Sequence, residues 1–151
     1  MEKQIETLAQ EFMDALHSLE QGDETEAEPL AILFSEDATL TNAALELAGK
    51  EVKGRDAVLQ FWNEYKSTLG QAFSTFHHVT TSGQNDQPGR SDKAAGLFWT
   101  TEGQGPDGQP VRYHGATLLE FDEMGLIKFF RGYYDTRELT VRGETSEAAS
   151  A

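Results

Sequence analysis

The sequence contains no cysteine, and this absence excludes several kinds of chemistry. Without a thiol the chain forms no disulfide, carries no thiolate nucleophile and offers no zinc–thiolate site. Two of the four histidines, His77 and His78, are adjacent in an expected strand. Alternation along a strand sends neighbouring side chains to opposite faces, so this pair does not form a metal site by itself. We therefore predict no metal ion and no cofactor.

Basic residues are also scarce. The chain has 12 Lys and Arg against 26 Asp and Glu, a formal net charge of −14. No basic stripe is present to neutralise phosphates, so we expect neither a nucleic-acid partner nor an anionic membrane surface. No apolar run reaches the roughly 20 residues that a membrane span needs. The first ten residues, MEKQIETLAQ, are acidic and amphipathic, unlike a secretory signal, and a cytoplasmic protein is expected.

What the sequence does have is length for one domain and many aromatic residues. It holds 151 residues, with nine Phe, four Tyr and two Trp as large core pieces. Apolar residues at helical spacing predict one helix from Ile5 to about Leu19 and another over Arg55–Leu69. A short helix is expected near Pro29, with Leu33 and Phe34 on its buried side. Gly22 is expected to end the first helix in the left-handed conformation.

The second half of the chain reads as strands. A short strand is expected over Ala38–Ala43, and four longer ones follow from Gln71 onward: FSTFHHVTTS, KAAGLFWTTEG, PVRYHGATLLEF and LIKFFRGYYD. Short turns between the last three predict an antiparallel meander. The polar stretch 82–92 is expected to be a loop, and residues 142–151 a disordered tail, so the single domain spans 1–141. Helices followed by strands indicate an α+β fold with three N-terminal helices on a curved antiparallel sheet.

The last strand is apolar on both faces, whereas a strand with one solvated face alternates. The residues concerned are Ile127, Phe129, Phe130, Tyr133 and Tyr134. One face is expected to pack on the helices. We expect the other face to be covered by a second subunit, which predicts a homodimer through the sheet.

Four segments carry a resemblance to a known family: LFSEDATL, GKEVKGRDAVLQFW, LLEFDEMGLI and FFRGYYDTREL. Together with the order of elements, they resemble the nuclear transport factor 2-like superfamily, in its SnoaL-like (polyketide-cyclase-like) branch, over residues 5 to 139. The resemblance implies a cone-shaped half-barrel with an apolar pocket at its open end. It does not imply one activity, because the superfamily includes isomerases, epoxide hydrolases, cyclases, dehydratases and binding proteins.

The catalytic residues of the better-known relatives are missing from the matching positions. A general base needs a titratable group beside the proton that it removes, and none of the replacements supplies one. Gly132 stands where relatives have a catalytic Asp, and Thr117 stands where they have a His or an acid. Leu97 and Trp99 lie near the positions of an Arg and an Asp. Phe12 replaces a Tyr, and Asn42 replaces an acid. The catalytic residues are therefore unknown, and the three familiar mechanisms are not expected.

Five residues remain as candidates for binding a ligand: Asn42, Trp99, Thr117, Phe130 and Tyr134. The Asn42 amide is suited to hydrogen-bond a ligand carbonyl without titrating. Trp99, Phe130 and Tyr134 supply aromatic walls, and strand alternation places Phe130 and Tyr134 on the same face as Gly132. Aromatic walls are equally typical of an ordinary core.

Three further polar residues have simpler interpretations. Alternation from Thr117 turns His114 away from the pocket face. Asp37, expected at a helix-to-strand junction, is suited to accept backbone hydrogen bonds. Asp135, at the end of the last strand, is expected to hold a turn or cap a helix.

These observations predict a protein that binds a small hydrophobic organic molecule. They leave open whether it is an enzyme, such as an isomerase, cyclase or hydrolase of unrecognised mechanism. The alternative is a non-catalytic binding or dimerisation module whose pocket is only core. A cavity of about 300 Å³ or more with converging polar groups favours the first, and filling by Trp62, Trp99 and Phe130 favours the second.

Overall fold

A computed structural model describes residues 4–69, 71–82, 93–105 and 107–137 of the chain. Almost all of the loop expected over 82–92, and the whole of the tail expected over 142–151, lie outside these ranges. The domain boundary at residue 141 lies outside them as well.

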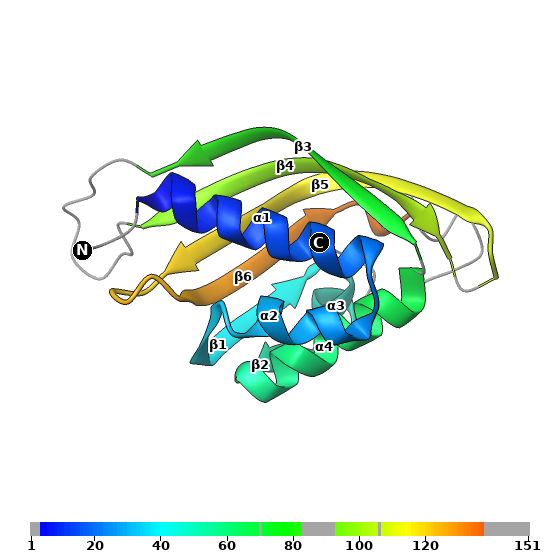
Figure 1. Cartoon of the computed structure of the whole chain (residues 1–151). Coiled ribbons are helices and arrows are strands. Elements are labelled where there is room, and N and C mark those ends of the chain that lie inside the picture. The colour runs from blue at the N-terminus through cyan, green and yellow to red at the C-terminus, as the bar shows by residue number, and fades with distance from the viewer. Residues whose placement is uncertain (1–3, 70, 83–92, 106, 138–151) are drawn as a thin grey trace.

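The structure has the α+β fold that the sequence predicts, with helices on one face of a single curved sheet (Figure 1). The helices are α1 (Ile5–Gln21), η1 (Glu24–Glu26, a 3₁₀ helix), α2 (Ala27–Ala31), α3 (Ala43–Leu47) and α4 (Arg55–Leu69). The strands are β1 (Phe34–Asn42), β2 (Val52–Lys53), β3 (Ala72–Thr81), β4 (Ala94–Gln104), β5 (Pro110–Phe121) and β6 (Ile127–Tyr134). Helix α1 packs against β3 and β4, and α4 packs against β1 (Figure 1).

The sheet has the strand order β2-β1-β6-β5-β4-β3. Strands β3 to β6 form the predicted antiparallel meander, while β1 runs parallel to β6. Phe34 starts β1 opposite Ile127 of β6, so it is not part of the short helix predicted near Pro29. The strand thus begins four residues earlier than its alternating sequence indicates, because it finds its partner at the far end of the chain.

Gly22 ends α1, but not in the predicted left-handed conformation. Its φ is −104°, and its N–H donates to the carbonyl oxygen of Ser18. A Cβ at this position would stand 2.7 Å from that oxygen. Close approach of the backbone, rather than positive φ, is the reason that glycine fits here.

Aromatic rings fill the space between α1, α4 and the sheet. Phe12, Phe34, Trp62 and Phe130 are all fully buried, with Trp62 and Phe130 in edge-to-face contact at 5.6 Å between ring centroids. Edge-to-face pairs add about 0.5–1.5 kcal/mol beyond the area that they bury. The space between α1, α4 and the sheet is therefore a packed core.

The prediction that the adjacent His77 and His78 point to opposite faces of the sheet is wrong. A β-bulge between Phe76 and His78 interrupts the alternation of β3. His77 hydrogen-bonds Thr100 at 2.8 Å and His78 contacts Phe98, and both partners project from the face of β4 away from the helices. Neither histidine therefore faces the interior, because a bulge adds one residue and shifts the side-chain phase.

Candidate functional site

The sheet register brings together the positions at which the resemblance places catalytic groups. Asn42 on β1 is opposite Gly132 on β6, and Gly132 is opposite Thr117 on β5. Leu97 on β4 continues the same row beyond Thr117. Gly132 is buried and contributes no side chain to the row. These positions lie side by side, but Asn42 carries an amide, Thr117 carries a hydroxyl and Gly132 has no side chain.

Two of the polar candidates, Asn42 and Thr117, already bond within the protein. The Asn42 side-chain oxygen accepts a hydrogen bond from the Leu45 backbone N–H at 2.8 Å and caps α3. The Trp99 indole N–H donates to the Thr117 hydroxyl at 2.8 Å. All three of Asn42, Trp99 and Thr117 are buried. Phe130 is also core, since it contacts Phe12, Phe34 and Trp62.

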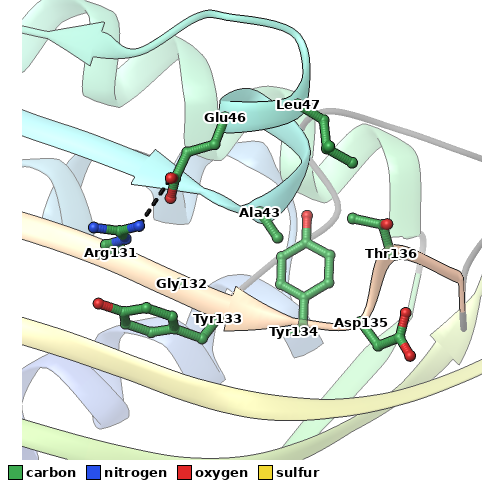
Figure 2. A pocket seen from close by; sticks show the side chains of 9 residues that line it. All are labelled: Ala43, Glu46, Leu47, Arg131, Gly132, Tyr133, Tyr134, Asp135 and Thr136. Carbon is green, nitrogen blue, oxygen red and sulfur yellow. Dashed lines mark hydrogen bonds and ion pairs between the residues drawn. The ribbon is translucent and has the colours of Figure 1, made fainter.

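Tyr134 has a different setting, because it lines a hollow of about 460 Å³ between α3 and the end of β6 (Figure 2). We call this the α3–β6 hollow. Its lining residues are Ala43, Glu46 and Leu47 from α3 and Arg131, Gly132, Tyr133, Tyr134, Asp135 and Thr136 from β6 and the turn after it. The hollow exists because β1 ends at Asn42, so β6 continues without this neighbour and α3 lies beside it.

The charged groups of the hollow are paired. The Arg131 guanidinium donates to the Glu46 carboxylate at 2.8 Å (Figure 2) and lies 5.0 Å from the centroid of the Tyr133 ring. Asp135 accepts hydrogen bonds from the backbone N–H and the guanidinium of Arg137, which confirms the turn role predicted for it. The Arg137 side chain lowers the pKa of Asp135, and this carboxyl therefore stays ionised near neutrality.

A second polar centre lies deeper and was not predicted. Glu20 is fully buried, and its carboxylate accepts hydrogen bonds from the Tyr65 hydroxyl at 2.6 Å and from the backbone N–H and hydroxyl of Ser74. The Ser74 hydroxyl also contacts that of Thr101. Glu20 follows Leu16 by four residues on the buried face of α1, so the helical spacing in the sequence already indicates that Glu20 faces the interior.

Two buried tyrosines flank this centre. Burial raises the pKa of Tyr65 well above its usual range, and the nearby Glu20 carboxylate adds to the shift. Burial likewise raises the pKa of Tyr113, whose ring contacts Trp99 and Tyr134. The nearby Tyr65 side chain lowers the pKa of Tyr113 and so offsets part of this increase. In the described part of the chain, however, the Tyr113 hydroxyl makes no hydrogen bond of normal geometry.

In the described part of the chain, no group of three or more His, Asp or Glu side chains is placed to hold a metal ion. Within the same ranges, no helix has both the length and the apolar character to cross a membrane.

Residues 9–130 match the model of the SnoaL-like domain family. The chain belongs to this family. No protein with curated function matches the sequence significantly.

Solved structures similar to this SnoaL-like chain share its fold at low identity. A putative isomerase from Bacillus subtilis has a TM-score of 0.70 at 17% identity, over 95% of this chain and 99% of the other. The epoxide hydrolase/cyclase-like enzyme SalBIII, which acts in pyran ring formation in salinomycin, has a TM-score of 0.68 at 16% identity. The match covers 89% of this chain and 92% of the other. The BvnE pinacolase from Penicillium brevicompactum has a TM-score of 0.71 at 9% identity. The match covers 92% of this chain and 91% of the other. Such identities support the fold alone.

Proposed function

We propose that this SnoaL-like chain binds a small organic molecule in the α3–β6 hollow, with Tyr134 as a contact residue. The observation that carries the proposal is the composition of the hollow. Its volume of about 460 Å³ lies in the range of ligand sites, and it combines Ala43, Leu47 and tyrosine rings with a few polar groups. A ligand with an apolar body and one or two polar groups fits this lining.

The same geometry favours binding over acid–base catalysis. The two carboxylates of the hollow, Glu46 and Asp135, are each paired with an arginine. A catalytic acid or base works best with a pKa near the operating pH, and the pKa of Asp135 is lowered instead. The similar structures include enzymes of pyran ring formation and pinacolase activity, so catalysis on an organic molecule is the second arm of the test.

The test is a titration of the purified chain with a library of small organic molecules, followed by thermal shift and calorimetry. The Tyr134 hydroxyl is buried in the free chain, so a bound molecule reaches it only when the ring turns toward the hollow. For a molecule that binds in this way, Tyr134→Phe is expected to weaken affinity about five- to ten-fold, because one hydrogen bond is lost. Tyr113→Phe, which changes a tyrosine outside the hollow, is the matched control and leaves affinity unchanged. Ala43→Leu narrows the hollow beside Tyr134 and is expected to weaken binding while the melting temperature is kept.

If no member of the library binds, or if Tyr113→Phe and Tyr134→Phe act alike, the hollow is not the site. If mass spectrometry shows that a bound molecule is converted to a product, the function is catalysis and not binding alone.

A different observation favours the non-catalytic module as the second candidate. Trp62, Trp99 and Phe130 are all buried, so side chains fill the interior between the helices and the sheet. Under this candidate the fold serves for dimerisation only. Failure of the whole library to shift the melting temperature, with a dimeric mass in solution, is the result expected for it.

We also propose a homodimer formed through the sheet face that points away from the helices, and a cytoplasmic setting for this cysteine-free chain. Support for the dimer comes from Phe98 and Tyr133, which are 43% and 46% exposed on that face. Large exposed aromatic residues are typical of association surfaces. Light scattering is expected to give twice the chain mass for the wild type and the single-chain mass for Phe98→Glu.

A further inference from the structure

The α3–β6 hollow reaches around β6 to the opposite side of the sheet. Gly132 and Tyr134 lie on the inner side of β6, opposite Thr117 and Gly115. Arg131 and Tyr133 lie on the other side, opposite Leu118 and Ala116 of β5. All four β6 residues line the hollow. One part of its wall therefore belongs to the face of the sheet that none of the helices in the described residues covers.

That face, which we call the outward face, carries a row of largely apolar side chains. The register aligns His78, Phe98, Ala116 and Tyr133 across the four strands β3 to β6. Phe98 and Tyr133 are the exposed aromatic residues of the row. The row ends at Tyr133, which lines the hollow.

The distribution of charge favours a second copy of the chain as the occupant of this face. The chain has a formal net charge of −14, so two copies repel one another over most of their surface. The outward face of β4 to β6 is nearly neutral, with two acidic and three basic side chains: Glu102, Glu120, Arg112, Lys128 and Arg131. Register opposes Glu102 to Arg112. Through this face two copies meet without the repulsion that the helix side would impose.

We propose that a second copy of the chain, docked on the outward face, forms the missing wall of the α3–β6 hollow. The proposal rests on the function proposed above for the hollow, and it adds that the binding site is complete only in the dimer. Arg131 and Tyr133 are the residues shared by the two surfaces. Leu47 of α3, which is 78% exposed in the single chain, is then covered by the partner.

The absence of cysteine makes the proposal testable without any ligand. A single thiol placed by Leu47→Cys reports whether the hollow is covered, through its rate of reaction with the thiol reagent DTNB. The same substitution combined with Phe98→Glu gives the rate in a chain whose outward face is blocked by charge. Phe98 does not line the hollow, so it changes the thiol only through the partner. The control is Ile32→Cys, a residue 56% exposed at the end of α2 on the helix side.

The expected result is a dimeric Leu47→Cys chain whose thiol reaction is largely lost, and recovery of the reaction when Phe98→Glu makes the chain monomeric. Ile32→Cys reacts at the same rate in both backgrounds. A dimer in which Cys at 47 reacts as fast as in the monomer overturns the proposal, and so does a chain that is monomeric at every concentration. Neither outcome depends on a ligand, so failure here is distinct from failure of the hollow to bind one.

Discussion

At the scale of single residues, the tyrosines of the interior differ in what their hydroxyl groups do. Tyr65 donates to the buried carboxylate of Glu20 at 2.6 Å, so its hydroxyl satisfies a group that would otherwise be costly to bury. The Tyr113 hydroxyl is equally buried, but it has no partner of normal geometry among the described residues. The two side chains look alike in the sequence and have opposite energetic roles.

Replacing each tyrosine by phenylalanine separates these roles. Tyr65→Phe is expected to lower the free energy of unfolding by about 1–3 kcal/mol, because the Glu20 carboxylate loses a donor. Tyr113→Phe is expected to change it by less than about 0.5 kcal/mol or to raise it, because no bond is lost. Urea unfolding at neutral pH measures both. Equal losses in the two variants would show that Tyr113 also makes a bond that matters.

The same tyrosines predict a loss of stability in alkali. Burial raises the pKa of Tyr65 and Tyr113 in the folded chain above the unfolded value of about 10. Above that pH the unfolded chain loses protons that the folded chain keeps, so the stability present below pH 10 falls as pH rises. The slope is about 1.4 kcal/mol per pH unit for each tyrosine. Unfolding measured from about pH 9 to pH 11 is expected to be less steep in Tyr113→Phe.

At the scale of elements, the short helix α3 decides whether the hollow exists. It has five residues, too few to be stable alone, and the Asn42 side chain caps its first turn. Its residues Ala43, Glu46 and Leu47 form one wall of the hollow. Asn42, expected to contact a ligand, thus acts on the hollow by holding the wall in place, and direct contact with a ligand stays a prediction.

Removing the cap tests this dependence. Asn42→Ala is expected to lower the free energy of unfolding by about 0.5–2 kcal/mol and to weaken binding in the hollow, because α3 loses its start. Asn42→Ser keeps a capping oxygen and is expected to restore most of both. Thermal unfolding and ligand titration of the two variants measure the effects. Full binding by Asn42→Ala would show that α3 does not depend on its cap.

At the scale of the whole molecule, negative charge is distributed unevenly. The net charge is −14, whereas the outward face of the sheet carries nearly equal numbers of acidic and basic groups. Salt therefore screens little charge repulsion between two copies that meet through that face, and the dimer is stabilised little by added salt. Its dissociation constant is expected to change by less than about three-fold between roughly 0.05 M and 0.5 M salt, measured by analytical ultracentrifugation. A marked tightening with salt would place the interface on the acidic helix side instead.

The sequence by itself determined the fold class, the long helices and the meander. Leu8, Phe12 and Leu16 recur at helical spacing, and the strands from Phe73 onward are separated by turn residues, so local pattern and final structure agree. The resemblance to the SnoaL-like branch was carried by segments such as LFSEDATL, and the family model matches residues 9–130. These features depend on residues that are near one another in the chain.

Only the tertiary structure decided the start of β1, the side of His78 and the place of the hollow. Phe34 joins a strand because Ile127, almost a hundred residues later, lies beside it. A bulge between Phe76 and His78 moves His78 to the outward face, and no local pattern announces it. The hollow forms where β1 stops and β6 continues, which is a relation between two strands distant in sequence. Gly132 lies next to Asn42 and Thr117 for the same reason: pairing between strands, not spacing along the chain, sets which residues meet.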